Sequence, residues 1–223
     1  MTKFIVVSGT GTEIGKTVAT AALAAREVSE GTRVGIAKPI QTGLEPGEDG
    51  DCHMAARLAG ITAAFEHRRL REPLAPETAA RRAGEYQSTA AELAQTVRHW
   101  ASGQELDVVF VEGAGGVLAR LGTDTTIIDV ARELDAPVVL VTSAELGTLS
   151  ATELATRYLR AEGLECLGLV IGSWPDAPDL AQRCNVEDLP RLTGERLLGA
   201  VPRGAGSLAP EEFAHHAPGW FCP

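Results

Sequence analysis

The chain has 223 residues and a formal net charge of −10 at pH 7, with 44% hydrophobic and 22% charged residues. This composition is ordinary for a folded globular protein and excludes an intrinsically disordered chain. Because the net charge repels polyanions, and no apolar run is long enough to span a bilayer, we expect neither a nucleic-acid partner nor a membrane. Cys52, Cys166, Cys184 and Cys222 have no paired spacing. They suggest no disulfide framework and no zinc site, and favour a cytoplasmic location.

Apolar runs rich in β-branched residues alternate with helical patterns along the chain. Runs without polar alternation predict strands that are buried on both faces. The predicted strands are 4–8, 33–37, 107–112, 137–142, 166–172 and 197–201, and the predicted helices are 16–30, 89–101 and 148–163, with another beginning at Asp51. This alternation predicts a mostly parallel sheet covered by helices on both faces.

Two segments are expected to lie outside this regular pattern. Residues 38–50 are predicted to form a wide connection rich in glycine and acid, and residues 67–84 a solvated, partly helical surface. Since no repeat or long linker divides the sequence, we expect a single domain over residues 1–223.

The loops that follow the predicted strands are expected to carry the functional residues. In open α/β sheets ligands bind beyond the carboxyl ends of the strands. The connection 38–50 and the loops after Ser8, Glu112, Thr142 and Gly172 should therefore face one site.

The sequence "GTGTEIGKT", residues 9–17, lies between a predicted strand and a predicted helix. It resembles a phosphate-binding loop with five residues, in place of the usual four, between Gly9 and Gly15. Backbone N–H groups at the helix start, the charge of Lys16 and the hydroxyl of Thr17 would favour a phosphate with its magnesium ion. A plain tight turn is the simplest alternative.

A dinucleotide site is a second alternative, because Gly9, Gly11 and Gly15 also form a glycine-rich turn. That fold normally ends its second strand with an acid, whereas this sequence has Lys38 and Pro39. The dinucleotide alternative is weakened but stays open.

An acid at the end of the strand 107–112 favours the triphosphate interpretation. Nucleotide hydrolases and kinases of this fold keep an acid there to organise magnesium, and Glu112 is in this position. Thr17, Asp51 and Glu112 would suffice as ligands of Mg²⁺, although helix capping by Asp51 and a solvated loop at Glu112 are alternatives for each residue alone. The motifs predict a P-loop NTPase-like Rossmann fold of the α/β class.

Four ordered motifs resemble those of the dethiobiotin synthetase family across essentially the whole chain. They are "GTGTEIGKT", "KPIQTG" with Lys38 and Thr42, Asp51 before a helix, and "VEGAGG" at 111–116. The resemblance implies an ATP-dependent ligase of biotin biosynthesis. It would close a ureido ring on 7,8-diaminopelargonate with CO2 or bicarbonate, through a carbamate and a carbamic-phosphoric anhydride. It would use Mg²⁺ and act as a homodimer.

The resemblance also implies roles for single residues. Lys16, which follows the β- and γ-phosphates, and Lys38, which binds the carbamate and the transferred phosphoryl group, would be catalytic. The implied nucleotide-binding residues are Glu13, Ile14, Gly15, Lys16, Thr17, Val18, Asp51, Glu112, Gly113, Ala114, Gly115, Gly172, Ser173, Pro202, Arg203 and Gly204. The implied substrate residues are Thr12, Thr42 and Pro76 from one subunit and Leu146, Gly147, Thr148, Leu149 and Ser150 from the other.

The sequence departs from the family pattern at two places. Ser150 stands where the family usually has Asn, and "IGSWPD", 171–176, replaces an Asn-containing stretch that reads the adenine ring. We therefore expect a relaxed choice among nucleoside triphosphates, CTP included. Trp174 would either stack on the base or pack against the final helix.

Other functions compatible with a phosphate loop remain as alternatives. A regulatory or partitioning ATPase usually has a lysine where this chain has Thr10. An amidoligase of the cobyrinate type would need a glutamine-hydrolysing domain, and an NADP reductase would bind its cofactor without magnesium.

Overall fold

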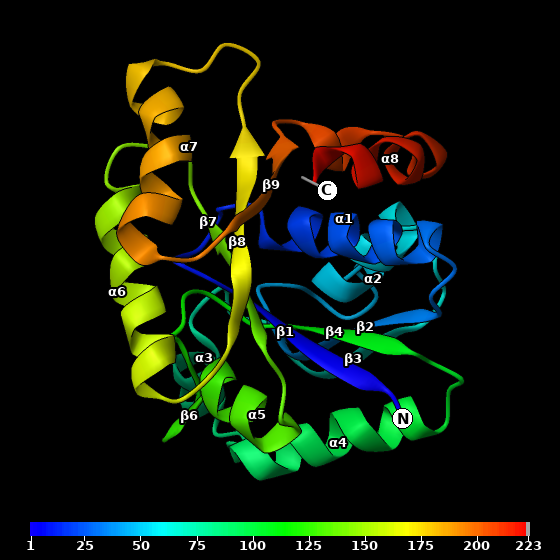
Figure 1. The fold of residues 1–223 in the computed structure, drawn as a ribbon. Helices are drawn as coiled ribbons and strands as arrows, with labels where there is room; N and C mark the ends of the chain where they lie inside the picture. The colour runs from blue at the N-terminus through cyan, green and yellow to red at the C-terminus, as the bar shows by residue number, and fades with distance from the viewer. Residues whose placement is uncertain (222–223) are drawn as a thin grey trace.

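A seven-stranded parallel sheet in the order β3-β2-β4-β1-β7-β8-β9 forms the centre of residues 1–221, the part of the chain that this computed structural model describes (Figure 1). Cys222 and the end of the predicted 1–223 domain lie outside the described residues. The sheet strands are β1 (Lys3–Gly9), β2 (Val34–Thr42), β3 (Ala64–Leu70), β4 (Val108–Glu112), β7 (Val138–Thr142), β8 (Cys166–Trp174) and β9 (Leu197–Pro202). The antiparallel pair β5 (Arg120–Gly122) and β6 (Thr125–Thr126) lies apart from the sheet. The predicted α/β fold with a parallel sheet is confirmed.

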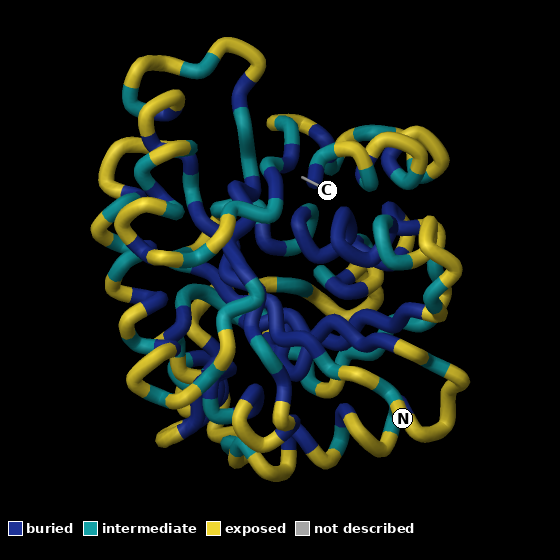
Figure 2. Tube along the Cα trace, in the orientation of Figure 1, coloured by how far each residue is buried: buried dark blue, intermediate teal, exposed yellow. Residues whose placement is uncertain are grey.

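Helices cover both faces of this sheet, and the strands between them are buried (Figures 1 and 2). One face carries α1 (Lys16–Ser29), α2 (Asp51–Leu58), α8 (Pro210–His216) and the 3-10 helix η2 (Ala217–Trp220). The other carries α3 (Pro76–Ala83), α4 (Ala90–Ser102), α5 (Ile127–Leu134), α6 (Thr148–Ala161) and α7 (Leu180–Thr193), while the 3-10 helix η1 (Ala205–Ser207) follows β9. Successive residues of a strand supply opposite cores, since Val6 packs toward α5 and Val7 toward α1.

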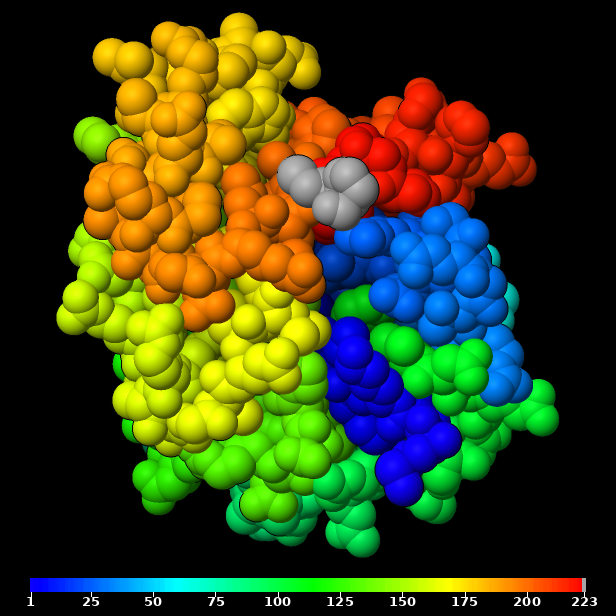
Figure 3. Space-filling view, in the orientation of Figure 1, coloured from blue at the N-terminus to red at the C-terminus, as the bar shows by residue number. Residues whose placement is uncertain are grey.

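The C-terminal segment closes the face that carries α1. Phe213 of α8 is fully buried and meets Trp220 edge-on at 5.1 Å, and Phe221 packs in the same core as α1. In the space-filling view the segment that contains α8 and η2 lies directly beside α1 (Figure 3). His215 and His216 at the end of α8 are exposed. Trp174 instead packs with the core on the α5 side, so its expected packing against the final helix is wrong.

The predicted helices 16–30, 89–101 and 148–163 are confirmed as α1, α4 and α6, with ends that agree to within two residues. The predicted helix start at Asp51 is confirmed as the start of α2. Helices α5 and α7 are additions that the sequence reasoning missed. No helix within residues 1–221 is both long and apolar enough to span a membrane.

Strand β2 is longer than the prediction, which ended it at Ala37. Its pairing with β4 stops at Ala37, but its pairing with β3 continues from Lys38 to Thr42. Proline has no backbone N–H to donate to a neighbouring strand. Pro39 is tolerated in this extension because β4 no longer pairs with β2 there, so no hydrogen bond is lost. The predicted wide connection therefore begins only after Thr42, and Lys38 and Thr42 stand on a strand.

Strand β3 was missed because its sequence resembles a solvated surface. The segment "AFEHRRL" has charged residues throughout, and residues 67–84 were expected to be solvated. It forms an outer strand of the sheet, where charged side chains are tolerated because only one edge is paired. The helical part of the expectation is confirmed by α3.

Candidate active site

The loop between β1 and α1 contacts the end of β8 backbone to backbone. Gly15 precedes α1 in the left-handed region, with φ 87°. A Cβ atom on Gly15 would lie 2.2 Å from the Gly172 carbonyl oxygen, and one on Gly172 would lie 2.0 Å from the Ile14 carbonyl oxygen. Both positions therefore require glycine, and Gly172 shapes the loop through packing.

Lys16 begins α1 and is buried beneath this loop, with 8% of its surface exposed. Its Nζ donates a hydrogen bond to the Gly11 carbonyl oxygen at 2.5 Å. Burial lowers the pKa of Lys16 to about 8, although Glu112 acts in the opposite direction. A lysine beside the free N–H groups of a helix start is the arrangement that binds phosphate.

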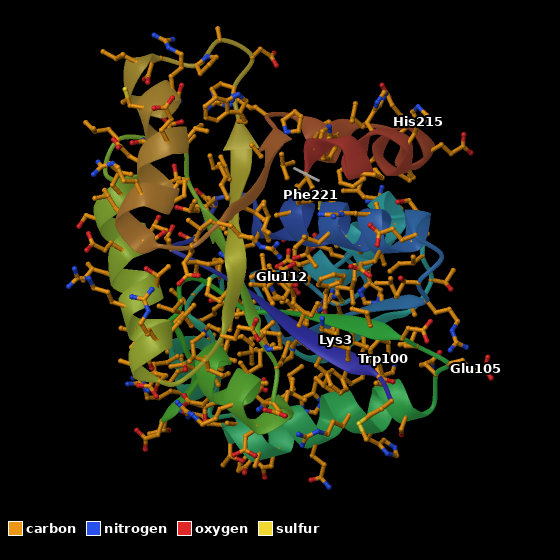
Figure 4. All side chains as sticks on the ribbon, in the orientation of Figure 1. Lys3, Trp100, Glu105, Glu112, His215 and Phe221 are labelled. Atoms are coloured by element: carbon orange, nitrogen blue, oxygen red, sulfur yellow. The ribbon has the colours of Figure 1, made fainter. Side chains whose placement is uncertain are left out.

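Lys38 of β2 lies at the centre of a buried ionic cluster. Its Nζ is 2.7 Å from Asp51 Oδ2 and 2.7 Å from Glu112 Oε1, and it donates to the Gly113 carbonyl oxygen at 3.1 Å. The Thr17 hydroxyl donates to the same Glu112 Oε1 at 3.0 Å. Glu112 lies in the interior of the molecule (Figure 4). The fold thus brings together Lys38 and all three predicted metal ligands from β2, α2, β4 and α1.

The charge of Lys38 is maintained by its neighbours. Its burial disfavours the ammonium form, but Glu112 and Asp51 outweigh that effect and raise the pKa of Lys38 above its ordinary value. Lys38 therefore carries a full positive charge inside the protein at neutral pH.

The oxygen atoms around Lys38 fit a magnesium ion. Glu112 Oε2 is buried and has no hydrogen-bond partner among the described residues, which is unusual for a carboxylate oxygen. Magnesium prefers a few carboxylate and hydroxyl oxygens and completes its shell with phosphate oxygens and water. Thr17, Asp51 and Glu112 offer such a set.

A cleft of about 1180 Å³ opens over the cluster. Its walls come from the loop after β1, from the end of β2 and the loop after it, from the loop after β4 and from residues 73–76. The predicted residues that line it are Thr12, Glu13, Gly15, Lys16, Thr17, Val18, Lys38, Thr42, Asp51, Pro76, Glu112, Ala114 and Gly115. Ile14 instead packs into the core beneath α1, and Gly113 supplies a carbonyl oxygen to Lys38.

The residues predicted to bind the base do not line this cleft, so the shared site expected of the loops after Thr142 and Gly172 stays a prediction. Pro202 pairs with Trp174, and the Arg203 N–H donates to the Trp174 carbonyl oxygen at 2.7 Å. Two neighbouring strands thus carry the predicted base-side residues. Gly172 and Ser173 lie in the last part of β8, and Pro202 ends β9 and is followed by Arg203 and Gly204.

The start of α6 is also separate from the cleft. Leu146 is 87% exposed, and Gly147 caps the helix with φ 97° and offers no side chain. Thr148 is buried, where its hydroxyl lies 2.7 Å from that of Thr142. The predicted substrate residues Leu146, Gly147, Thr148, Leu149 and Ser150 therefore lie apart from Thr12, Thr42 and Pro76 within one chain.

Two groups near the site were missed from the sequence. Gln41 lines the cleft and accepts a hydrogen bond from the backbone of Asp51; only its place in "KPIQTG" hinted at a role. The fold also brings Cys52, His53 and Glu66 within metal-binding distance of one another, although the spacing of the cysteines suggested no zinc site. Both oxygens of Glu66 accept from Arg69, which a metal would have to displace.

Comparisons with solved structures show what kind of fold this is. The signal recognition particle receptor FtsY from Elizabethkingia anophelis in complex with GDP matches with a TM-score of 0.63 at 17% identity, over 98% of this chain and 64% of that one. A chain of the MinC:MinD cell division complex from Aquifex aeolicus matches with a TM-score of 0.58 at 12% identity, over 99% and 98%. The chain spans less than two thirds of FtsY, and such low identities show the fold alone.

Sequence comparisons define the family. A family profile described as an AAA domain matches residues 3–210. An ATP-dependent dethiobiotin synthetase from Streptomyces coelicolor is 55% identical over 98% of this chain and 92% of its own length, and one from Rhodococcus jostii is 53% identical over 97% and 94%.

The fold, the glycine-rich loop with Lys16 and the cluster around Lys38 define a P-loop nucleotide-dependent enzyme. The relatives and the profile identify the family within this class. The chain belongs to the family of ATP-dependent dethiobiotin synthetases, which are ligases. A regulatory or partitioning ATPase is not favoured, because that likeness extends only to the fold.

Proposed function

We propose that the protein closes the ureido ring of dethiobiotin from 7,8-diaminopelargonate and CO2 at the expense of ATP. One observation carries this proposal: the Lys38 ammonium is held 2.7 Å from both Asp51 and Glu112 in a cleft that Lys16 also lines. A hydrolase acting on water needs only the phosphate loop and the metal ligands. A second buried cation beside these ligands is suited to a second anionic substrate in the same cleft.

The chemistry explains why that anion is needed. One amine of the substrate captures CO2 as a carbamate and loses a proton, and the carbamate oxygen then attacks the γ-phosphorus of ATP and displaces ADP. The second amine then attacks the carbonyl carbon of the resulting anhydride and phosphate leaves. Two unit charges 4 Å apart repel by roughly 4 kcal/mol at an effective dielectric of 20, which corresponds to about three decades in rate. Lys16 and Lys38 would cancel this repulsion through charge that is already in place.

Mg²⁺ fits the same account. Thr17, Asp51 and Glu112 would hold it, and its charge would polarise the phosphate oxygens of the nucleotide. The unpaired, buried Glu112 Oε2 supports this assignment.

The cleft walls suggest how the two substrates are arranged. The phosphates would lie on Gly15, Lys16 and Thr17, with Ile14, Val18 and residues 113–115 shaping the loops around them. The diamine would meet Thr42, Thr12 and Pro76, which line the same cleft. Glu13, which borders both groups, has φ 55°, and a non-glycine residue in this region often marks a functional loop.

The substrate carboxylate would be bound by a second copy of the chain. The start of α6 offers free N–H groups without a side-chain cap, a favourable place for an anion, but it lies apart from the cleft. In a homodimer, Leu146, Gly147, Thr148, Leu149 and Ser150 of one subunit would reach the cleft of the other. The exposure of Leu146 and Leu154 supports such an interface.

The base would be bound with little discrimination. Gly172 offers no side chain to the base and packs closely against the backbone of Ile14, and Ser173 has only a hydroxyl. Pro202, Arg203 and Gly204 would border the base from the neighbouring strand. Other triphosphates, CTP among them, should therefore replace ATP.

Three further proposals concern the domain organisation, the location and the partners of the protein. The protein works as one domain over residues 1–223, in the cytoplasm, without a nucleic-acid or membrane partner. The net charge of −10 supports the lack of a nucleic-acid partner.

The decisive experiment detects dethiobiotin by mass after incubation of 7,8-diaminopelargonate, bicarbonate and Mg²⁺ with each nucleoside triphosphate. We expect product with ATP and with CTP, and a loss of at least three decades in rate for Lys38→Ala. Lys3→Ala is the matched control, since Lys3 is exposed at the start of β1. Product formation that survives Lys38→Ala would remove Lys38 from its role, and strict preference for ATP in an equal-concentration competition would refute the relaxed choice of base.

A further inference from the structure

Helix α2 begins without a side-chain cap of its own. Its N-cap residue is Gly50, and the first residue of the helix is Asp51. The first N–H groups of a helix have no partner within it and need an acceptor from elsewhere. For Asp51 that acceptor comes from β2, because Gln41 Oε1 accepts from the Asp51 backbone N–H at 2.9 Å.

The Gln41 side chain is fixed at both ends. Its Nε2 donates to the Thr42 carbonyl oxygen at 3.1 Å, and only 5% of the residue is exposed. Because the amide donates on one side and accepts on the other, its orientation is determined by its partners. Gln41 thus connects the start of α2 to Thr42 on the cleft wall.

The segment before α2 is pressed against the same support. A Cβ atom on Gly50 would lie 2.2 Å from Glu66 Oε2 and 3.3 Å from Gln41 Oε1, so a larger residue would have to displace these side chains. Arg69 of β3 binds both oxygens of Glu66, at 2.7 and 2.8 Å. It also donates to the carbonyl oxygens of Glu45 and Glu48 at 2.9 and 2.6 Å.

We propose that Gln41 is a positioning residue that sets the place of the Asp51 carboxylate relative to Lys38 and Glu112. The Asp51 side chain reaches Lys38 at 2.7 Å from a helix start whose only side-chain acceptor among the described residues is Gln41. Without that acceptor the Asp51 N–H loses its partner and the first turn of α2 shifts or frays. This inference rests on the proposed function, in which Asp51 is a ligand of Mg²⁺.

The test compares Gln41→Met, a substitution of similar length without an acceptor, with Gln104→Met, which replaces an exposed glutamine. The readout is the affinity for Mn²⁺, titrated by electron paramagnetic resonance in the presence of a non-hydrolysable ATP analogue. Residues that orient metal ligands typically contribute 10- to 100-fold to metal affinity. We therefore expect Gln41→Met to weaken Mn²⁺ binding about tenfold and Gln104→Met to leave it unchanged. The KM for Mg²⁺ should rise more than kcat falls.

A purely structural role would give a different result. A lower melting temperature with unchanged Mn²⁺ affinity would overturn the proposal, as would no change in either. Gln41→Asn, which keeps the amide but shortens its reach, replaces Gln41→Met if that variant does not fold, and the same loss of affinity is expected. Asp51→Asn tests the proposed metal site separately from the role of Gln41. Unchanged Mn²⁺ affinity in Asp51→Asn would contradict the metal site. A loss of affinity in Asp51→Asn but not in Gln41→Met would contradict only the role of Gln41.

Discussion

Lys16 and Lys38 hold their charges in different ways. Lys38 has two carboxylate partners at 2.7 Å, which raise its pKa despite its burial. Lys16 has no ion-pair partner among the described residues, its Nζ donates to a carbonyl oxygen, and burial lowers its pKa to about 8. The charge of Lys38 is therefore stabilised by the protein itself. The charge of Lys16 has no such partner, and the proposed phosphate ligand would stabilise it.

The lowered pKa of Lys16 predicts a pH dependence of nucleotide binding. Bound phosphates should raise this pKa again, so above about pH 8 the neutral lysine must take up a proton on binding. We expect the affinity for ATP to be flat below pH 8 and to fall by up to tenfold per pH unit above it. Calorimetry at pH 7, 8 and 9 in buffers of different ionisation enthalpy measures both the affinity and the proton uptake.

Lys16→Arg is the control for this prediction, because arginine stays charged throughout this range. Its affinity, whatever its absolute value, should not show the decline above pH 8. An identical decline in both proteins would assign the titration to another group.

Helix starts differ between the scaffold and the site. α4, α5 and α7 begin with complete capping boxes, which satisfy their first N–H groups. α1, α2 and α6 begin instead at Gly15, Gly50 and Gly147, which offer no side-chain cap. In α2 another strand supplies the acceptor, while α1 and α6 begin without a side-chain cap, which agrees with the anionic ligands proposed for them.

The contact between the phosphate loop and β8 predicts a strong effect of one added methyl group. In Gly172→Ala the new Cβ atom would lie 2.0 Å from the Ile14 carbonyl oxygen, so the loop must move. We expect a loss of about 1–3 kcal/mol in the free energy of unfolding and a roughly tenfold weaker affinity for ATP. Urea denaturation and calorimetry measure the two effects.

Gly103→Ala is a matched control, since its Cβ atom would meet only the Trp100 carbonyl oxygen, at an ordinary 3.6 Å. Unchanged ATP affinity in Gly172→Ala would mean that the loop adapts and that this contact does not shape the phosphate site.

Two exposed large apolar side chains lie in α6 or just before it. Leu146 and Leu154 are 87% and 68% exposed, and Leu154 borders a groove of about 230 Å³ together with Ser150, Glu153 and Arg157. These groove residues recur at the spacing of one helix face. The exposed side chains of Leu146 and Leu154 support the proposed interface with a second copy at this helix.

The substitution Leu154→Arg tests this interface in the whole protein. A buried charge without a partner is costly, so we expect the dimer to dissociate in sedimentation equilibrium. The KM for 7,8-diaminopelargonate should rise at least tenfold, because the partner would no longer supply the start of α6. The affinity for ATP should persist, since the phosphate loop lies within one chain.

Val28→Arg is the control, because Val28 is 37% exposed on α1 at the opposite face of the sheet. A Leu154→Arg variant that remains a dimer with an unchanged KM would exclude this face as the interface.

Local sequence was sufficient wherever the signal lies within one segment. The buried strands, the helices α1, α4 and α6, and the glycine-rich loop were predicted correctly because their periodicity and residue types are local properties. Strand β3 was missed because an outer strand with charged residues has no pattern of buried residues, and the extension of β2 was missed because Lys38 and Pro39 interrupt its apolar run. Helices α5 and α7 were also missed.

By itself, the sequence determined the fold class, the phosphate loop and the identity of the residues around it, because each depends on residue type and spacing along the chain. Only the tertiary structure decided that Lys38 lies 2.7 Å from both Asp51 and Glu112, that Gly15 and Gly172 touch through their backbones, and that Gln41 holds the start of α2. These contacts join residues from different elements. Their distances depend on the register of parallel strands and on how closely helices pack on the sheet, which no single segment of sequence encodes.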